Sequence, residues 1–154
     1  MNIQEQTACG VEQEIESWRE KLLSIAPDAA HEKPADDRWS ISEVIGHLVD
    51  SACNNHQRFV RAQHGSALVF PKYDQSHWVI AANYQAYDWA SLVELWYQYN
   101  RVISVLMRRI PDDRMSTACT IEPYATCSLE FLVTDYLDHL RHHLEKLNAR
   151  MVAP

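Results

Sequence analysis

The sequence predicts an all-α protein, a four-helix bundle that occupies residues 1–154 as a single domain. Three observations indicate this fold class. The chain has only 3 glycines against 6 prolines, which leaves little room for the many tight turns of an all-β fold. Four long stretches carry apolar residues at intervals of three and four, the period of an amphipathic helix. A connection of about 25 residues, 64–88, separates the second of these stretches from the third.

The first two helices are expected over residues 10–26 and from Ser40 to about residue 63. Pro27 stops the first helix, and a loop follows it. The second begins with Ser40-Ile41-Ser42-Glu43, which fits a capping box, in which the Ser and Glu side chains satisfy unpaired amides of the first turn. Gly65 is its expected end. Each of these two stretches therefore has its own helix start or stop signal.

The third and fourth helices are expected over residues 89–110 and from about residue 128 to 147. Pro111 follows the third helix. The long connection before it allows the chain to cross the bundle, so that the third helix runs parallel to the second. This crossover contains a short helix from about Gln75, and its aromatic residues could cap one end of the bundle.

The composition and net charge limit the kinds of molecule that the protein is expected to bind. The net charge of −7 and pI near 5.5 argue against nucleic-acid binding, which needs a basic surface. The polar, acidic amino terminus has no signal-peptide character, and no apolar run approaches the roughly 20 residues that span a bilayer. We expect a cytoplasmic protein without membrane contact. The four cysteines form no CxxC pair, and we expect reduced thiols.

The most informative segment is residues 136–147, Y-L-D-H-L-R-H-H-L-E-K-L, which places His139 and His143 one helical turn apart. Residues at i and i+4 share one face of a helix, so the two imidazoles can bind one divalent metal if a third ligand joins them. His142 lies about 100° around the helix from His143 and is expected to face solvent.

The candidate third ligand is His47, at the inward margin of the second helix in the segment W-S-I-S-E-V-I-G-H-L-V-D-S. Asp50 or Asp135 could orient a ligating imidazole through its second nitrogen. Together with Glu43 they are the nearby carboxylates, and none stands out as a general base. Spacing alone leaves a purely structural role for these histidines open. We expect solvent-facing or loop positions for the other histidines, His31, His56, His64 and His77. For the Cys53 thiol we expect a core position.

Three segments carry a family resemblance: W-S-I-S-E-V-I-G-H-L-V-D-S, P-K-Y-D-Q-S-H-W and D-H-L-R-H-H. Over residues 11–150 the chain resembles the DinB-like superfamily and its YfiT-type metal-dependent hydrolases. The resemblance implies an up-down-down-up four-helix bundle, in agreement with the long crossover. It also implies a zinc or nickel ion held by three histidines, which fall on His47, His139 and His143. In similar proteins the crossover lies near the metal, which makes Tyr73 and Trp78 candidates for pocket residues.

The resemblance also indicates a range of activities. Similar proteins include thiol-dependent S-transferases and isomerases that use low-molecular-weight thiols, besides hydrolases, and they are frequently dimers. We therefore expect a metal-dependent enzyme with a small-molecule substrate, which activates a thiol or water. The alternatives are a non-enzymatic metal-binding or stress-response bundle, and an interaction module in which Trp18, Trp96 and the tyrosines of the third helix form a dimer face.

Overall fold

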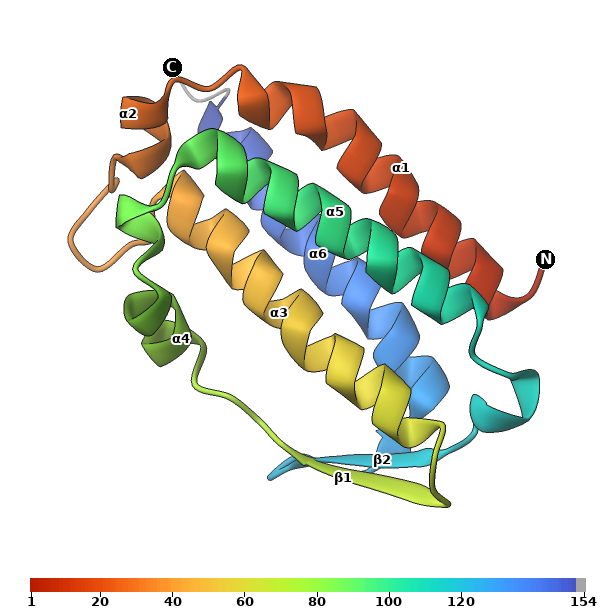
Figure 1. Ribbon diagram of the computed structural model, residues 1–154. Coiled ribbons are helices and arrows are strands. Elements are labelled where there is room, and N and C mark those ends of the chain that lie inside the picture. Colours follow the sequence, from red (N-terminus) through yellow and green to blue (C-terminus); the bar gives the residue numbers. More distant parts are fainter. Residues whose placement is uncertain (152–154) are drawn as a thin grey trace.

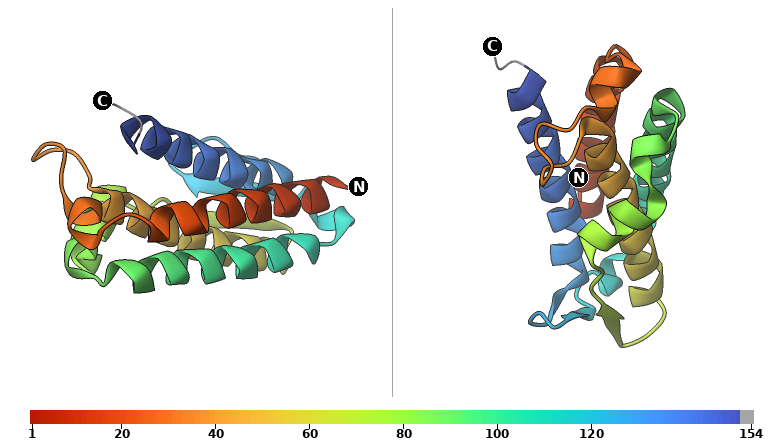
Figure 2. Two further views of the ribbon diagram at one scale, coloured as in Figure 1. Left: turned by 90° about the horizontal axis from the view of Figure 1, so that it is seen from above. Right: turned by 90° about the vertical axis from the view of Figure 1, so that its left-hand side faces the viewer.

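The computed structural model describes residues 1–151 and confirms the predicted fold class. Its long helices are α1 (Ile3–Leu23), α3 (Ile41–Ala62), α5 (Trp89–Arg108) and α6 (Leu129–Met151). Figures 1 and 2 show α1 and α6 running in one direction and α3 and α5 in the other, the up-down-down-up order. Each long helix packs against two others, α1 and α3 both lying between α5 and α6.

Short elements occupy the connections between the long helices. They are α2 (Pro27–His31), β1 (Ala67–Pro71), α4 (Gln75–Ala82), η1 (Tyr84–Ala86), η2 (Asp112–Arg114), β2 (Ala118–Glu122) and β3 (Cys127–Ser128). The strands form a sheet of order β1-β2-β3, with β1 parallel to β2 and β3 antiparallel to it. The sheet and α2 lie toward opposite ends of the bundle (Figures 1 and 2).

Neither the sheet nor α2 was predicted, since the sequence indicated only loops there. Five-residue strands are too short to show a clear alternation of apolar and polar side chains. β1 and β2 are fixed by pairing across about 50 residues of sequence, with Leu68 opposite Cys119 and both side chains buried. The sheet is therefore a product of tertiary contact.

The helix starts follow the capping rules. Ser40 caps α3 as predicted: its hydroxyl accepts from the Glu43 amide, and the Glu43 carboxylate accepts from the Ser40 amide. The predicted start of the first helix at residue 10 is wrong, because α1 begins at Ile3, where the Asn2 side chain accepts from the Glu5 amide. The Gln4 amide group is buried and donates to the Ile110 carbonyl, so tertiary contacts help to hold the first of about two added turns.

The crossover contains the predicted helix from Gln75, and this helix lies against the side of the bundle and not over one of its ends. Figure 1 shows α4 lying alongside α3, and the two helices are in contact. The following turn presses the Tyr84 ring onto Gly46 of α3, where an added Cβ would lie 2.1 Å from the nearest ring atom. Tyr84 is buried and its hydroxyl donates to Asp50 Oδ1 at 2.7 Å. The crossover is thus fastened to the side of α3.

The tryptophans proposed for a dimer face belong to the core. Trp96 is fully buried and Trp18 is 6% exposed, so neither side chain is available to a second molecule. The exposed apolar residues of α5 are Leu95, Val102 and Val105. No helix among residues 1–151 has the length and apolar character needed to cross a bilayer.

Candidate metal centre

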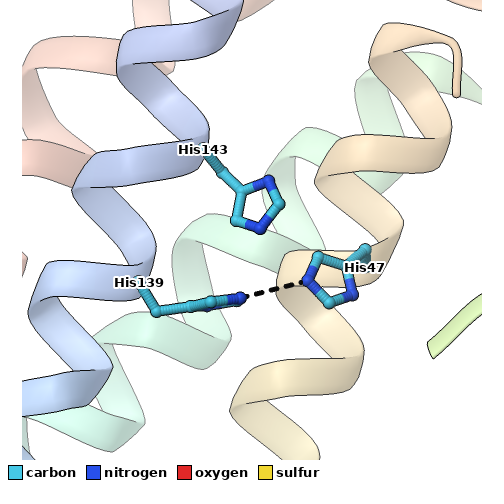
Figure 3. Close-up of side chains that lie close together, drawn as sticks. All are labelled: His47, His139 and His143. Carbon is cyan, nitrogen blue, oxygen red and sulfur yellow. Dashed lines mark hydrogen bonds between the residues drawn. The ribbon is translucent and has the colours of Figure 1, made fainter. Parts of the chain in front are cut away.

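α3 and α6 bring the three predicted histidines together. Figure 3 shows His47 on α3 facing His139 and His143 on α6. One possible ligand atom from each histidine lies within 4.8 Å of those of the other two. His47 Nε2 and His139 Nε2 are 3.2 Å apart, and the ring centroids of His139 and His143 are separated by 4.6 Å.

The helices place these side chains through their ordinary periodicity. His139 and His143 occupy adjacent turns of α6, beside the buried Leu140 and Leu144, which pack into the core. On α3, every residue from Ile41 to Ala52 is buried, so His47 is enclosed whatever its exact rotation about the helix axis. The Trp39 ring lies against the His47 imidazole, with centroids 5.1 Å apart. His142 is exposed, as predicted.

Burial keeps the three imidazoles neutral. Desolvation is the main cause that lowers the pKa of His47 to about 3, with smaller contributions from His139 and His143. The pKa values of His139 and His143 are lowered to about 4, again chiefly by desolvation. A metal-ligating histidine must be unprotonated, so all three are in the required state at neutral pH.

The donor set fits a divalent transition metal. Zn–N bonds of about 2.0–2.1 Å in tetrahedral geometry place two ligating nitrogens about 3.3 Å apart. The observed Nε2 separation of 3.2 Å between His47 and His139 agrees with this value. Three neutral imidazoles suit zinc, nickel or copper better than magnesium or calcium, which prefer oxygen. Three protein ligands would also leave a coordination position open.

The second imidazole nitrogens do not meet the predicted carboxylates. His139 Nδ1 lies 3.5 Å from the Ser51 hydroxyl, and not beside Asp135. His47 Nδ1 is buried and has no hydrogen-bond partner among residues 1–151, and the same is true of Asp50 Oδ2. Asp50 instead accepts from Tyr84, and burial raises its pKa. The prediction that Asp50 or Asp135 orients an imidazole is therefore wrong for this conformation.

A cleft of about 970 Å³ adjoins the histidine cluster and has His139 in its wall. One side comes from α3 and the other from α6, and the β2–β3 turn and the chain after β1 close the rest. The lining is mixed, with aromatic, charged and hydroxyl side chains. Its polar members include Ser51, Asn55, Arg58, Lys72, Tyr73 and Asp135. Its size is that of a small-molecule site.

The remaining candidate residues divide between cleft and scaffold. Tyr73 lines the cleft as predicted, whereas Trp78 does not and packs against the Tyr73 ring at 5.1 Å. Glu43 is held by the α3 cap and by an ion pair with Lys33, which removes it as a general base. Cys53 is only half-buried, so it is not the fully buried thiol that was expected.

The other four histidines lie outside the cluster. His64 and His77 are exposed, as predicted. His31 is half-buried, and its two ring nitrogens lie 2.7 and 3.0 Å from the carbonyl oxygens of Pro27 and Tyr87. Half-buried His56 lies 3.3 Å from the Tyr99 hydroxyl. These two were expected to face solvent or lie in loops, but tertiary neighbours give them structural hydrogen bonds.

Comparison with known proteins places the chain in a family. The sequence profile of the DinB superfamily matches residues 11–147. The chain belongs to the DinB superfamily. No curated protein matches the sequence.

Solved structures of two DinB-like proteins share its fold. YfiT from Bacillus subtilis, described as a probable metal-dependent hydrolase with an unusual four-helix bundle topology, is 18% identical with a TM-score of 0.84, covering 96% of this chain and 87% of its own. The mycothiol-dependent maleylpyruvate isomerase is 13% identical with a TM-score of 0.73, covering 94% of this chain and 60% of its own. A point mutant of the same isomerase gives a TM-score of 0.74.

Sequence reasoning missed several residues around the DinB site. Ser51 follows His47 by four residues and so shares its helix face, a spacing that could have revealed it. Asn55 and Arg58 continue the same face along the cleft. The β2–β3 turn, residues 123–126, gave no such signal, because its place in the wall depends on the unpredicted sheet.

Proposed function

We propose that this DinB protein is a metal-dependent enzyme that acts on a small molecule, with His47, His139 and His143 holding a zinc or nickel ion. The single observation that carries the proposal is the convergence of three neutral, enclosed imidazoles at the wall of a cleft. When bound, such an ion would lower the pKa of a coordinated water or thiol and so supply a nucleophile at neutral pH.

The protein's own residues would prepare this site. The Ser51 hydroxyl can accept from His139 Nδ1–H, which leaves Nε2 with its lone pair directed toward His47. The walls of the cleft would hold the substrate beside His139 and reduce its contact with water. Asp135 is the carboxylate in the cleft wall one turn before His139, and could accept a proton from a molecule bound there.

The two structural neighbours suggest two different reactions, which an activity assay can distinguish. A hydrolase would use water, as the description of YfiT suggests, and a transferase or isomerase would use a low-molecular-weight thiol, as the name of the isomerase indicates. A panel of esters and amides, and a panel of thiols with a chromogenic electrophile, would separate them. Metal binding without turnover in either panel would favour the alternative, a metal-binding protein without catalysis.

Metal analysis of untagged protein tests the site itself. We expect near-stoichiometric zinc or nickel in the wild type and its loss in His47→Ala, His139→Ala and His143→Ala. His142→Ala is the matched control, since it removes an exposed imidazole from the same turn. Wild-type occupancy in any of the three variants would remove that residue from the ligand set, and metal-free wild-type protein after expression with either metal would contradict the proposal.

A further inference from the structure

The cleft contains an arginine, Arg58, with which no carboxylate of residues 1–151 forms an ion pair. Arg58 is half-buried on α3, its Nε atom is buried without a hydrogen-bond partner among the described residues, and Nη1 makes one long contact of 3.4 Å with Asn55. Its guanidinium also lies 5.7 Å from the Phe70 ring centroid. Desolvation lowers the pKa of Arg58, and neighbouring acidic groups, Asp135 among them, offset this effect only in part.

Arg58 differs in this respect from three other half-buried arginines. Arg19, Arg108 and Arg141 each form an ion pair with at least one glutamate. Half-buried Arg114, like Arg58, forms no ion pair with a carboxylate of residues 1–151, but it donates to the Gly65 carbonyl. Among residues 1–151 no carboxylate forms an ion pair with Arg58. A partly desolvated guanidinium that faces a cleft without a partner is suited to a planar oxyanion, which it can bind through two parallel hydrogen bonds.

The surroundings of Arg58 favour an anion from outside. Lys72 adds a second cation to the cleft wall, and burial raises the pKa of Tyr73 to about 12, so its hydroxyl remains a donor. Two acidic residues also line the cleft. Asp74 is occupied, since its carboxylate caps α4 by accepting from the His77 amide. Asp135 on α6 is the opposing charge that an incoming anion must tolerate.

The distance from Arg58 to the histidines limits the size of the ligand. Ser51, Asn55 and Arg58 follow one another at i, i+4 and i+7, on one face of α3. At 1.5 Å per residue, Arg58 is about 10 Å further along the helix than Ser51, which neighbours His139. Side chains on a helix lean toward its amino end, which brings the guanidinium closer to His139. A molecule the size of a short-chain acid or an amino-acid conjugate can therefore reach both ends.

We propose that the cleft binds a small molecule that carries a carboxylate, and that Arg58 binds this carboxylate while the other end of the molecule reaches His139. The role of the histidine end rests on the proposed function, whereas the Arg58 contact can be measured without metal. The substrate class is thus a carboxylic acid whose reacting group lies within about 10 Å of its carboxylate, given the helix rise.

The first experiment titrates metal-free protein with malonate by calorimetry, with malonamide as the uncharged analogue. We expect malonate to bind and malonamide not to, and Arg58→Gln to weaken malonate binding by about tenfold or more, the usual cost of losing a charge-assisted contact. Arg61→Gln is the matched control. This variant removes a positive charge from the next turn of α3. Arg61 lies over the same Phe70 ring as Arg58 but does not line the cleft.

A variant that removes a negative charge from the cleft, and should therefore tighten malonate binding, sharpens the test. Asp135→Asn removes the repelling charge and should tighten malonate binding a few-fold, whereas a ligand held by apolar contacts would not respond. Arg58→Lys keeps the charge but not the planar fork, and should bind malonate with intermediate affinity. Circular dichroism of each variant checks folding. Equal malonate affinity in wild type and folded Arg58→Gln and Arg58→Lys would overturn the proposal.

The second experiment separates this proposal from the metal site. Zinc-loaded protein is titrated with 6-mercaptohexanoate and with 1-hexanethiol, and we expect the acid to bind more tightly, with Arg58→Gln abolishing the difference. Failure of both zinc and nickel to bind, with the malonate result intact, would overturn the proposed function and leave the Arg58 contact standing. Zinc binding with equal affinity for the two thiols in wild type would overturn the role of Arg58 at this site.

Discussion

The three-histidine cluster and the cleft meet at His139, but they are built from different parts of the fold. Two long helices hold the cluster, and the buried face of α3 encloses His47. The cleft wall takes a third of its lining residues instead from the β2–β3 turn and the chain between β1 and α4. This difference shows that the long helices fix the positions of the donor atoms closely, whereas the connecting segments shape the cleft through which a ligand reaches those atoms.

Metal addition should give the largest contrast between the two regions. If the cluster is a preformed site, zinc present at about a thousandfold excess over its Kd should raise the free energy of unfolding by about 4 kcal/mol, because only the folded chain brings the three histidines together. Urea unfolding with zinc and with a chelator measures this effect. The increase should vanish in His143→Ala and persist in Tyr124→Ala, a change to an exposed side chain of the cleft.

Packing behind the cluster should tolerate little change. Gly46→Ala would place a methyl group against the buried Tyr84 ring, and we expect a loss of about 3 kcal/mol, at the upper end of what overpacking costs. Gly65→Ala is the matched control, because a Cβ there meets only ordinary contacts, and its effect should stay within about 0.5 kcal/mol. Chemical denaturation of both variants makes the comparison. Equal stabilities would show that Tyr84 moves freely and does not fasten the crossover to α3.

Acid should weaken the cluster in the metal-free protein. The pKa values of His139 and His143 are about 4 and that of His47 about 3, against 6.5 in the unfolded chain. Between these values the unfolded chain binds more protons than the folded one, so stability falls as the pH drops below 6.5. By pH 5 one such histidine costs about 2 kcal/mol, at about 1.4 kcal/mol per pH unit.

Urea unfolding of the metal-free protein between pH 7 and pH 5 checks this dependence. His47→Asn should show a shallower loss of stability than wild type, while His142→Asn, which changes an exposed ring, should follow the wild-type curve. Parallel curves for wild type and His47→Asn would mean that His47 is not held neutral by burial.

The smallest expected effect lies at the border of the two regions. Ser51→Ala removes the neighbour of His139 Nδ1 and should lower zinc affinity about tenfold, the lower end for residues that orient a metal-ligating histidine. Tyr124→Ala, which changes an exposed side chain elsewhere in the cleft wall, should leave zinc affinity unchanged. Competition with a chromophoric chelator measures both. Equal losses in the two variants would show that the cluster and the cleft respond as one unit.

The helical parts of this protein could be predicted because their causes are local. The capping box at Ser40, the helix-ending Pro111 and the apolar periodicity of each stretch are properties of neighbouring residues. The His139–His143 pair was readable for the same reason, since a spacing of four fixes a shared face. The first two turns of α1 were missed in part because Gln4 is held by the carbonyl of Ile110, more than 100 residues away, although the Asn2 cap is a local signal.

By itself, the sequence determined the bundle, the crossover and which histidines are candidates, because periodicity and capping act within a few residues. Tertiary structure alone decided that Nε2 of His47 and His139 lie 3.2 Å apart and that Asp50 pairs with Tyr84 and not with an imidazole. It also decided that Arg58 forms no ion pair with a carboxylate of residues 1–151. These facts depend on the packing of α3 against α6 and on a sheet formed between distant strands, and no local pattern encodes such contacts.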